Sequence, residues 1–583
     1  MTNAIPRPEF PRPQFVRKYC KYTDWKNLNG KWQFEIDREL TGTDRELWKS
    51  KNDLSSEILV PFCPECKLSG IGDRDFMNQV WYKRDIEIPE SWMGGRIILH
   101  FEACDYRTTL WINDDEVGTH DGGFVSFEFD ITQYVKPGTN KLALRVYDDT
   151  TNRSWPSGKQ SDQKESYGCM YTRTTGIWQT VWLESVNNAY ISSVKQTPVC
   201  DQKLLILEAE CKYADGMRFS AYAYDRVQDR PAGSVSGIVK SGKCLLVLEL
   251  NEIDELRLWD LGKPELYDIT YILGDDQNPD DCVESYFGMR EVYHKDDHLY
   301  LNGRKIFQRT VLDQGYYPDS LMTAPSEEEL LGDITRAMAM GFDGSRLHQK
   351  TFEQRFLYHC DHLGYFVWAE FGNWGLNNKY DTAWEGFVPE WYAAIRRDYN
   401  HPCVLGWIPF NETGCMQNQA LVRHCVDLVH YYDPYRPVIE ASGWAHIGAH
   451  TADILDWHDY TQEPEKLAEK LAPLDKGEPI SLRDGVVGRP TYISEYGGIG
   501  YKPGYIRPND GEAWGYGNAA VSEEEFLERL RGLTEVLYNN SGVSGFCYTQ
   551  LTDIEQEQNG LYYFDRRPKF DPDVIKAIIR MKE

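Results

Sequence analysis

The sequence of 583 residues has no long hydrophobic run, and its apolar stretches fall far short of the ~20 residues that a membrane-spanning helix needs. Its first residues, MTNAIPRPEFPRPQF, lack the basic start and apolar middle of a secretory leader. Positive charge is scarce, because 63 Lys and Arg face 91 Asp and Glu, and the net charge of −28 repels phosphate backbones and anionic lipid. We therefore expect a cytoplasmic protein that binds neither nucleic acid nor membranes.

Motifs for common cofactors are also missing. No strand expected in the C-terminal half is followed by a G-x-G-x-x-G or G-x-x-x-x-G-K-[ST] loop, which disfavours a nucleotide-binding sheet. The 14 Cys are scattered, and the one close pair, Cys63 and Cys66, lacks the second pair or nearby His that a zinc site needs. We expect buried, reduced thiols, no cofactor and no bound metal.

The N-terminal half has the pattern of two β-sandwiches. Residues 31–36 (KWQFEI), 96–101 (RIILHF) and 141–146 (KLALRV) belong to a series of short apolar runs that Gly, Pro and Asp interrupt. This series predicts an all-β sandwich over residues 1–189. A shorter stretch of the same kind, residues 190–288, predicts a smaller immunoglobulin-like sandwich.

From residue 289 to 583, helical patterns alternate with short apolar strands. Ser326, Thr351 and Ser522 each stand three residues before a Glu or Gln, which is the pattern of a capped helix start. Between the expected helices lie strand-like runs such as residues 365–368 (YFVW) and 404–407 (VLGW). The alternation predicts a (β/α)8 barrel, also called a TIM barrel.

Polar side chains follow the expected barrel strands, at the end where the catalytic mouth of such a barrel lies. The candidates for this mouth are Asp313, Arg346, His348, Glu370, Asn411, Glu412, His458, Tyr460, Glu495 and Gln550. Any one of them could serve only a structural hydrogen bond or ion pair, but so many together favour a working site. Two carboxylates from different strands are the minimum for glycoside hydrolysis, in which one protonates the leaving oxygen and the other captures or stabilises the sugar.

Two stretches resemble the catalytic motifs of glycoside hydrolase family 2. Residues 398–412 (DYNHPCVLGWIPFNE) are similar to its acid/base motif, and residues 489–497 (RPTYISEYG) are similar to its nucleophile motif. Residues 81–89, 111–124 and 175–184 resemble its sugar-binding jelly-roll domain. The resemblance implies three domains: a jelly roll, an immunoglobulin-like sandwich and a catalytic TIM barrel.

The resemblance also implies a mechanism, a retaining double displacement. Glu495 would attack the anomeric carbon, and Glu412 would protonate the leaving oxygen and then deprotonate water. Asn411 would bind the sugar 2-hydroxyl, and Tyr460 would orient Glu495. The remaining mouth residues are expected to bind substrate.

Departures from the family pattern bear on the substrate. Leu561 stands where glucuronidases of the family have a Lys that grips the sugar carboxylate, and an apolar group cannot pair a uronate, although Arg566 or Arg567 could substitute. Tyr496 stands where β-mannosidases usually have Phe or Leu. We therefore expect an exo-glycosidase for a terminal neutral sugar, similar to a β-galactosidase.

Other functions remain open. They are an α-L-arabinofuranosidase or β-galactofuranosidase, a β-glucuronidase, and a non-catalytic carbohydrate-binding protein of the same architecture. The expected partner is a small carbohydrate or glycoconjugate. Related enzymes often assemble, so a homo-oligomer is compatible with the resemblance.

Overall fold

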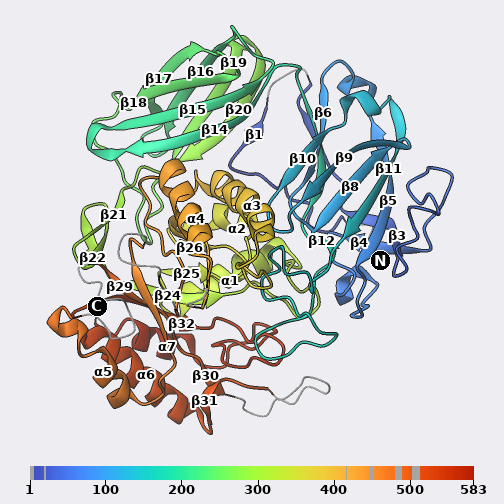
Figure 1. Ribbon diagram of the computed structural model, residues 1–583. Helices are drawn as coiled ribbons and strands as arrows, with labels where there is room; N and C mark the ends of the chain where they lie inside the picture. Colours follow the sequence, from blue (N-terminus) through green and yellow to red (C-terminus); the bar gives the residue numbers. More distant parts are fainter. Residues whose placement is uncertain are drawn as a thin grey trace.

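The computed structural model describes residues 5–18, 22–414, 417–444, 446, 452–478, 489–501 and 513–582. Two β-sandwiches and a parallel barrel follow one another along the chain, as the sequence predicts (Figure 1). Within these ranges, no helix has both the length and the apolar character that crossing a membrane requires.

The first sandwich contains two sheets and a short ribbon. Its strands are β2 (Asp24–Asn27), β3 (Gly30–Ile36), β4 (Ser56–Val60), β5 (Gln79–Ile88), β6 (Arg96–Phe101), β7 (Cys104–Asp105), β8 (Arg107–Ile112), β9 (Asp115–Asp121), β10 (Phe127–Asp130), β11 (Gly138–Tyr147), β12 (Gly176–Ile177) and β13 (Val181–Val186). Sheet β10-β6-β13-β2 packs on sheet β4-β3-β5-β11-β8-β9, and β7 pairs with β12. Leu99 and Leu144, one from each sheet, are fully buried in the core between them. The strands predicted at residues 31–36, 96–101 and 141–146 are confirmed.

The second sandwich includes a strand from the start of the chain. Its strands are β14 (Tyr190–Val199), β15 (Leu204–Lys212), β16 (Arg218–Asp225), β17 (Arg230–Ile238), β18 (Lys243–Glu249), β19 (Tyr267–Asp275), β20 (Asn278–Phe287) and β1 (Val16–Arg17). Sheet β14-β15-β18 faces sheet β1-β20-β19-β16-β17, and exposed and buried residues alternate along β18, as in a strand with one face in solvent. The N-terminal segment thus adds an edge strand here before the chain enters the first sandwich. The domain boundaries at residues 189 and 288 stay a prediction.

The barrel is one parallel sheet with order β27-β26-β25-β24-β32-β29-β28. Its strands are β24 (Gln308–Asp313), β25 (Gly344–Leu347), β26 (Phe366–Glu370), β27 (Val404–Ile408), β28 (Leu455–Asp459), β29 (Thr491–Gly497) and β32 (Val543–Thr549). Between β27 and β28, Val438 and Ser442 form isolated parallel bridges with Trp407 and Asn411. The predicted TIM barrel is confirmed, and its fifth strand is reduced to these bridges.

Smaller sheets flank the barrel. They are formed by β21 (Val292–Lys295), β22 (His298–Leu301) and β23 (Arg304–Ile306), and by β30 (Ile499–Tyr501) and β31 (Tyr516–Ala520).

Helices α1 (Glu327–Ala339), α2 (Gln354–Leu363), α3 (Thr382–Asp398), α4 (Gln419–Tyr432), α5 (Pro464–Leu471), α6 (Glu523–Asn539) and α7 (Pro572–Ile579) accompany the barrel strands. Ser326 and Ser522 cap α1 and α6 as predicted, each accepting a hydrogen bond from the backbone N–H three residues later. The cap predicted at Thr351 is wrong, because α2 begins at Gln354 after Glu353. Thr351 is buried in the loop after β25, before the first residue of the helix, and therefore does not occupy the N-cap position.

A long loop of the first sandwich, residues 148–175 between β11 and β12, lies against the barrel; we call it the wall loop. The Ser157 backbone N–H donates to the Trp374 carbonyl at 2.9 Å, and the Trp514 indole N–H donates to the Gly168 carbonyl at 2.7 Å. Thr172 donates to Glu555 through both its backbone N–H and its hydroxyl. The wall loop therefore contacts barrel segments that follow different strands.

Candidate active site

The two carboxylates singled out in the sequence meet at one end of the barrel. Glu495 lies in β29, and Glu412 follows β27. One carboxylate oxygen of each, together with a ring nitrogen of His458, lie within 4.8 Å of one another. This proximity agrees with retaining glycosidases, whose carboxyl groups are ~5–5.5 Å apart, and is shorter than the ~6.5–9.5 Å of inverting enzymes.

Glu412 has a constrained backbone. Its φ of 49° is in the left-handed region, which is unfavourable for a residue with a Cβ and is tolerated where surrounding structure enforces it. The Glu412 backbone N–H donates to the Ser442 carbonyl at 2.8 Å, and the neighbouring Asn411 N–H donates to Asn373 Oδ1 at 2.8 Å. These bonds fix the direction in which the Glu412 side chain leaves the chain.

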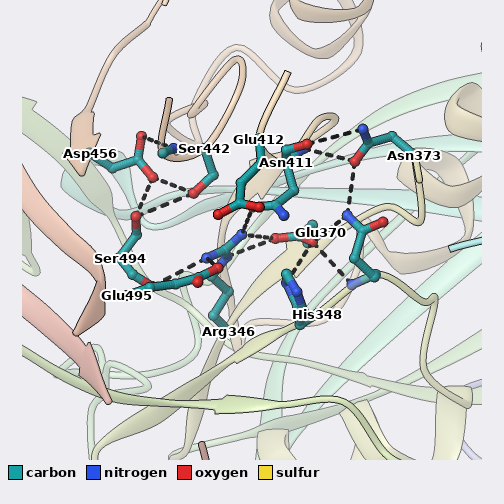
Figure 2. A network of polar contacts seen from close by, with 12 residues as sticks. Arg346, His348, Glu370, Asn373, Asn411, Glu412, Ser442, Asp456, Ser494 and Glu495 are labelled. Atoms are coloured by element: carbon teal, nitrogen blue, oxygen red, sulfur yellow. Dashed lines mark hydrogen bonds and ion pairs between the residues drawn. The ribbon is translucent and has the colours of Figure 1, made fainter. Parts of the chain in front are cut away.

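His458, in β28, lies between the two carboxylates. Its Nδ1 is 2.7 Å from Glu412 Oε1, and its Nε2 is 3.3 Å from Glu495 Oε1. Ser442 Oγ lies 3.1 Å from His458 Nε2, and Asp456 accepts hydrogen bonds from the hydroxyls of Ser442 and Ser494 (Figure 2). This chain of polar contacts, from Asp456 through Ser442, helps to fix the orientation of the His458 imidazole.

Arg346, at the centre of Figure 2, joins residues from several strands. Its Nη1 donates to Glu495 Oε1 at 2.8 Å, its Nη2 to Asn411 Oδ1 at 2.6 Å and its Nε to Glu370 Oε2 at 2.7 Å. The side chain is fully buried. A planar guanidinium can hold these three partners in one fixed arrangement, which an ammonium cannot do.

The environment of Glu495 favours its ionised form. Burial opposes ionisation, but electrostatic interaction with His458 and Arg346 holds the pKa of Glu495 well below its usual range. The Tyr460 hydroxyl donates to Glu495 Oε2, and the Tyr460 ring stacks on that of Tyr516. An ionised and firmly held carboxylate is what a nucleophile requires.

Glu370 supports Arg346 from the side away from Glu495. Burial opposes its ionisation, yet the Arg346 charge keeps the pKa of Glu370 at about 2. Gln349 donates to Glu370 from its backbone N–H at 3.0 Å and from its amide at 2.8 Å. His348 Nδ1 lies 2.9 Å from Glu370, while burial lowers the pKa of His348 to about 4. The sequence-predicted residues Glu370 and His348 thus belong to the same connected network as Glu495.

Two other predicted residues lie outside this network. Asp313 accepts a hydrogen bond from the Gly315 backbone N–H at 2.9 Å, and burial together with the charge of Asp333 raises its pKa to about 7. Gln550 accepts from Gln314 at 2.6 Å and donates to Asn559 at 3.0 Å. In the part of the chain that the structure describes, neither one hydrogen-bonds to Glu412 or Glu495, and their binding of substrate stays a prediction.

Three residues near this mouth are not among those predicted from the sequence: Lys159 and Tyr171 from the wall loop, and Glu557 after β32. The Tyr171 hydroxyl donates to Glu557 Oε2, and the Lys159 ammonium lies 5.1 Å from the centre of the Trp374 ring. The strand-end rule could not find Lys159 and Tyr171, which another domain supplies, or Glu557, which lies several residues beyond the end of β32. The one signal was the length of the wall loop, because long loops without strands are often functional.

Among the residues that the structure describes, two groups of side chains have the spacing of metal ligands: Glu412, His458 and Glu495, and Asp361, His401 and Cys403. In the second group, Asp361 accepts from His401 at 2.6 Å and from the Cys403 backbone N–H at 2.9 Å. In the first group, a cation would compete with the Arg346 charge beside Glu495. In both groups, the hydrogen bonds and ion pairs among the members explain why these side chains lie close together.

Two family models match adjoining parts of the N-terminal half, and individual relatives match more of the chain. Residues 25–186 match the model described as glycosyl hydrolases family 2, sugar binding domain, and residues 189–290 match the model described as glycosyl hydrolases family 2. A beta-galactosidase of Clostridium acetobutylicum is 24% identical over 594 residues, which covers 93% of this chain and 62% of that protein. A putative beta-glucuronidase of Formosa agariphila is 25% identical over 436 residues, covering 71% and 51% respectively. The chain spans less than two thirds of the length of either relative.

Solved structures extend the likeness to the whole chain. The β-glucuronidase from Ruminococcus gnavus in complex with D-glucuronic acid has a TM-score of 0.80 at 17% identity, covering 99% of this chain and all of that one. The Lactobacillus rhamnosus β-glucuronidase has a TM-score of 0.81 at 19% identity, covering 96% and 98%. At this identity the likeness shows a shared fold alone. The two adjoining family matches show that residues 25–186 and 189–290 belong to glycoside hydrolase family 2, and the whole chain shares the fold of these solved structures.

Proposed function

We propose that the protein is a retaining exo-glycosidase that works by double displacement, with Glu495 as nucleophile and Glu412 as acid/base. The observation that carries this proposal is the approach of their oxygens to within 4.8 Å at the mouth of the barrel. Membership of the family supports the reaction class.

In the first step, the ionised Glu495 attacks the anomeric carbon and the bond to the aglycone breaks. Hydrogen bonds from Arg346 and Tyr460 hold the attacking carboxylate in place. Glu412 gives its proton to the departing glycosidic oxygen, so the leaving group departs as a neutral alcohol. The product of this step is a sugar ester of Glu495.

In the second step, Glu412 removes a proton from water, which attacks the anomeric carbon and releases Glu495. Two inversions give net retention of configuration. Asn411 supports this picture, because its buried Nδ2 has no hydrogen-bond partner among the described residues while its Oδ1 is taken by Arg346. An orphaned donor beside Glu412 suits the sugar 2-hydroxyl.

The proposed substrate has a neutral terminal sugar, with β-D-galactosides first and α-L-arabinofuranosides or β-galactofuranosides next. Arg566, a candidate partner for a uronate, donates to both oxygens of Asp333 and stacks on Tyr317. Arg567 pairs with Asp565 at 2.8 Å, and Leu561 is fully buried. Relatives named for galactosides and for glucuronides both match, so a glucuronide remains a further candidate.

A panel of nitrophenyl glycosides of these four sugars tests the proposal, with the anomeric form of the first product followed by NMR. We expect hydrolysis with retention, and a loss of at least ~10³-fold in turnover for Glu495→Gln. An inverted first product, or full activity of the variant, would refute the assignment. Sugar binding without hydrolysis of any glycoside would instead favour the carbohydrate-binding protein.

A further inference from the structure

Lys159 in the wall loop has an unusual environment for a lysine. The residue is 7% exposed. Among the described residues, its ammonium has neither a carboxylate within 4.0 Å nor a hydrogen-bond acceptor. A lysine in such an enclosed position whose ammonium has no acceptor in the described part of the chain is free to donate its hydrogen bonds to a bound ligand.

The surroundings of Lys159 place it beside the proposed catalytic pair. Its Nζ lies 5.1 Å from the centre of the Trp374 ring and 6.0 Å from that of Tyr171. The Trp374 indole N–H donates to the Asn411 carbonyl at 3.3 Å, next to Glu412 in the chain. The Tyr171 hydroxyl donates to Glu557. The ammonium therefore lies between a residue anchored beside Glu412 and a residue bound to Glu557.

Glu557 complements Lys159 as a hydrogen-bond acceptor. It is buried, and its oxygens accept one bond from Tyr171 and one from Asn559 at 3.1 Å. Each oxygen of a carboxylate can accept a second hydrogen bond. Gln550 and Gln314 continue the network behind Asn559 and Tyr171, which holds the carboxylate in position.

The charges around Lys159 argue against an acidic sugar. Burial disfavours the ammonium, but the acidic groups around it, Glu557 and Glu495 among them, raise its pKa, so it stays protonated. The ammonium already interacts electrostatically with three carboxylates, those of Glu412, Glu495 and Glu557. A sugar carboxylate would add a further negative charge to this group, whereas a hydroxyl adds none.

We propose that Lys159 donates a hydrogen bond to a ring hydroxyl of the terminal sugar, while Glu557 accepts one from the same or an adjacent hydroxyl. The wall loop of the first sandwich would then select a neutral sugar for the barrel to cleave. This inference rests on the proposed glycosidase function and names two specificity-determining residues for it.

The test compares Lys159→Met with Lys164→Met, a matched change in the same loop at a lysine that is exposed and 3.8 Å from Asp75. On the best neutral glycoside, we expect Lys159→Met to lose about 10- to 100-fold in kcat/KM, the range for a hydrogen bond to a charged group. Lys164→Met should stay within about twofold of the wild type. Equal activity of both variants and the wild type would overturn the proposal.

Deoxy sugars identify the contact. With substrates that lack one hydroxyl at a time, the wild type should lose activity on the analogue lacking the bound hydroxyl. Lys159→Met should show no further loss on that same analogue, while Glu557→Gln should reduce discrimination at the same or an adjacent position. Additive losses at every position would overturn the proposal. A uronide as best substrate, lost selectively in Lys159→Met, would show that Lys159 binds a carboxylate and would also overturn it.

Binding without turnover separates this inference from the catalytic proposal. Calorimetry with Glu495→Gln and the free monosaccharide should show weaker affinity when Lys159→Met is added. If the wild type hydrolyses nothing but this difference persists, the catalytic proposal fails while the Lys159 contact stands. If the glycosidase is active but the difference is absent, the Lys159 contact fails alone.

Discussion

Two groups of buried carboxyl groups in this protein have pKa values that are shifted in opposite directions. At the barrel mouth, the pKa of Glu370 is about 2 and that of Glu495 is also well below its usual range. In the first sandwich, burial raises the pKa of Glu65 to about 7 and that of Asp105 to about 8. All four are fully or almost fully buried, so burial alone does not explain the contrast.

The groups next to each buried carboxyl decide whether its pKa is lowered or raised. Arg346 lies 2.8 Å from Glu495 at the mouth. Asp105 has only a neutral partner, the Gln160 amide at 2.7 Å, and Glu65 accepts from a backbone N–H at 3.1 Å. Across the described ranges, no Lys or Arg nitrogen lies within 4.0 Å of Glu65 or Asp105. A buried acid therefore stays charged where the fold supplies a cation beside it.

The largest expected effect is at the barrel mouth, from a change at Glu412, the proposed partner of Glu495. Glu412→Gln should lose about 10³-fold on methyl glycosides, which need a proton on the leaving oxygen, and far less on dinitrophenyl glycosides, which do not. The measurement is kcat/KM for leaving groups of graded acidity. Glu65→Gln, the same change in the sandwich group, should leave this dependence as in the wild type. A uniform loss of Glu412→Gln across leaving groups would contradict the acid/base role.

Arg346→Lys should cost about 10²-fold in kcat/KM, because an ammonium cannot bond Glu370, Glu495 and Asn411 together. The pH profile gives the sharper test. Arg346 helps to keep the pKa of Glu495 low, so weakening its hold should raise that pKa. The acidic limb of the profile should then move to higher pH, and a limb that moves to lower pH would contradict the account.

Tyr460→Phe should lose about tenfold in kcat, the effect of one hydrogen bond to a charged group. It should shift the acidic limb in the same direction as Arg346→Lys but by less, because the lost bond favours ionised Glu495. Tyr496→Phe is the matched control, since its hydroxyl bonds Thr534 at 2.9 Å on the helix side of β29. If both variants behave alike, the Tyr460 bond has no special role.

In the sandwich group we expect an effect on stability and none on the reaction. The pKa of Asp105 rises from 3.8 in the unfolded chain to about 8, so its contribution to the free energy of unfolding is full below pH 4 and is lost as the pH rises towards 8. The slope is at most about 1.4 kcal/mol per pH unit for one proton. Urea unfolding at pH 5 and pH 8 should show a shallower decline for Asp105→Asn than for the wild type. Equal declines would indicate that Asp105 is charged when folded.

Local patterns in the sequence predicted much of the fold. Ser326 and Ser522 could be identified as helix caps because a capping box acts within one turn. Thr351 has the same pattern, but tertiary packing buries it and delays the start of α2. The short strand β1 could not be predicted, since its partner β20 lies more than 250 residues away in the chain.

The candidate site was predicted in part. The strand-end rule gave both Glu370 and Asp313, yet only Glu370 bonds Arg346, because which way a strand-end side chain points depends on the register of the sheet. Lys159 lies on a loop whose position is set by docking against the barrel, and no periodic pattern encodes docking. The family motifs identified Glu412 and Glu495 because each motif is contiguous in the chain.

The wall loop has a consequence for anyone who would cut or recombine this protein. A barrel excised at residue 289 would keep Glu412 and Glu495 but lose Lys159 and Tyr171, leaving its mouth open on one side. Conversely, exchanging residues 148–175 between family members offers a way to alter sugar preference without touching a barrel strand. Under the two proposals, separate stretches of the gene encode reactivity and selectivity.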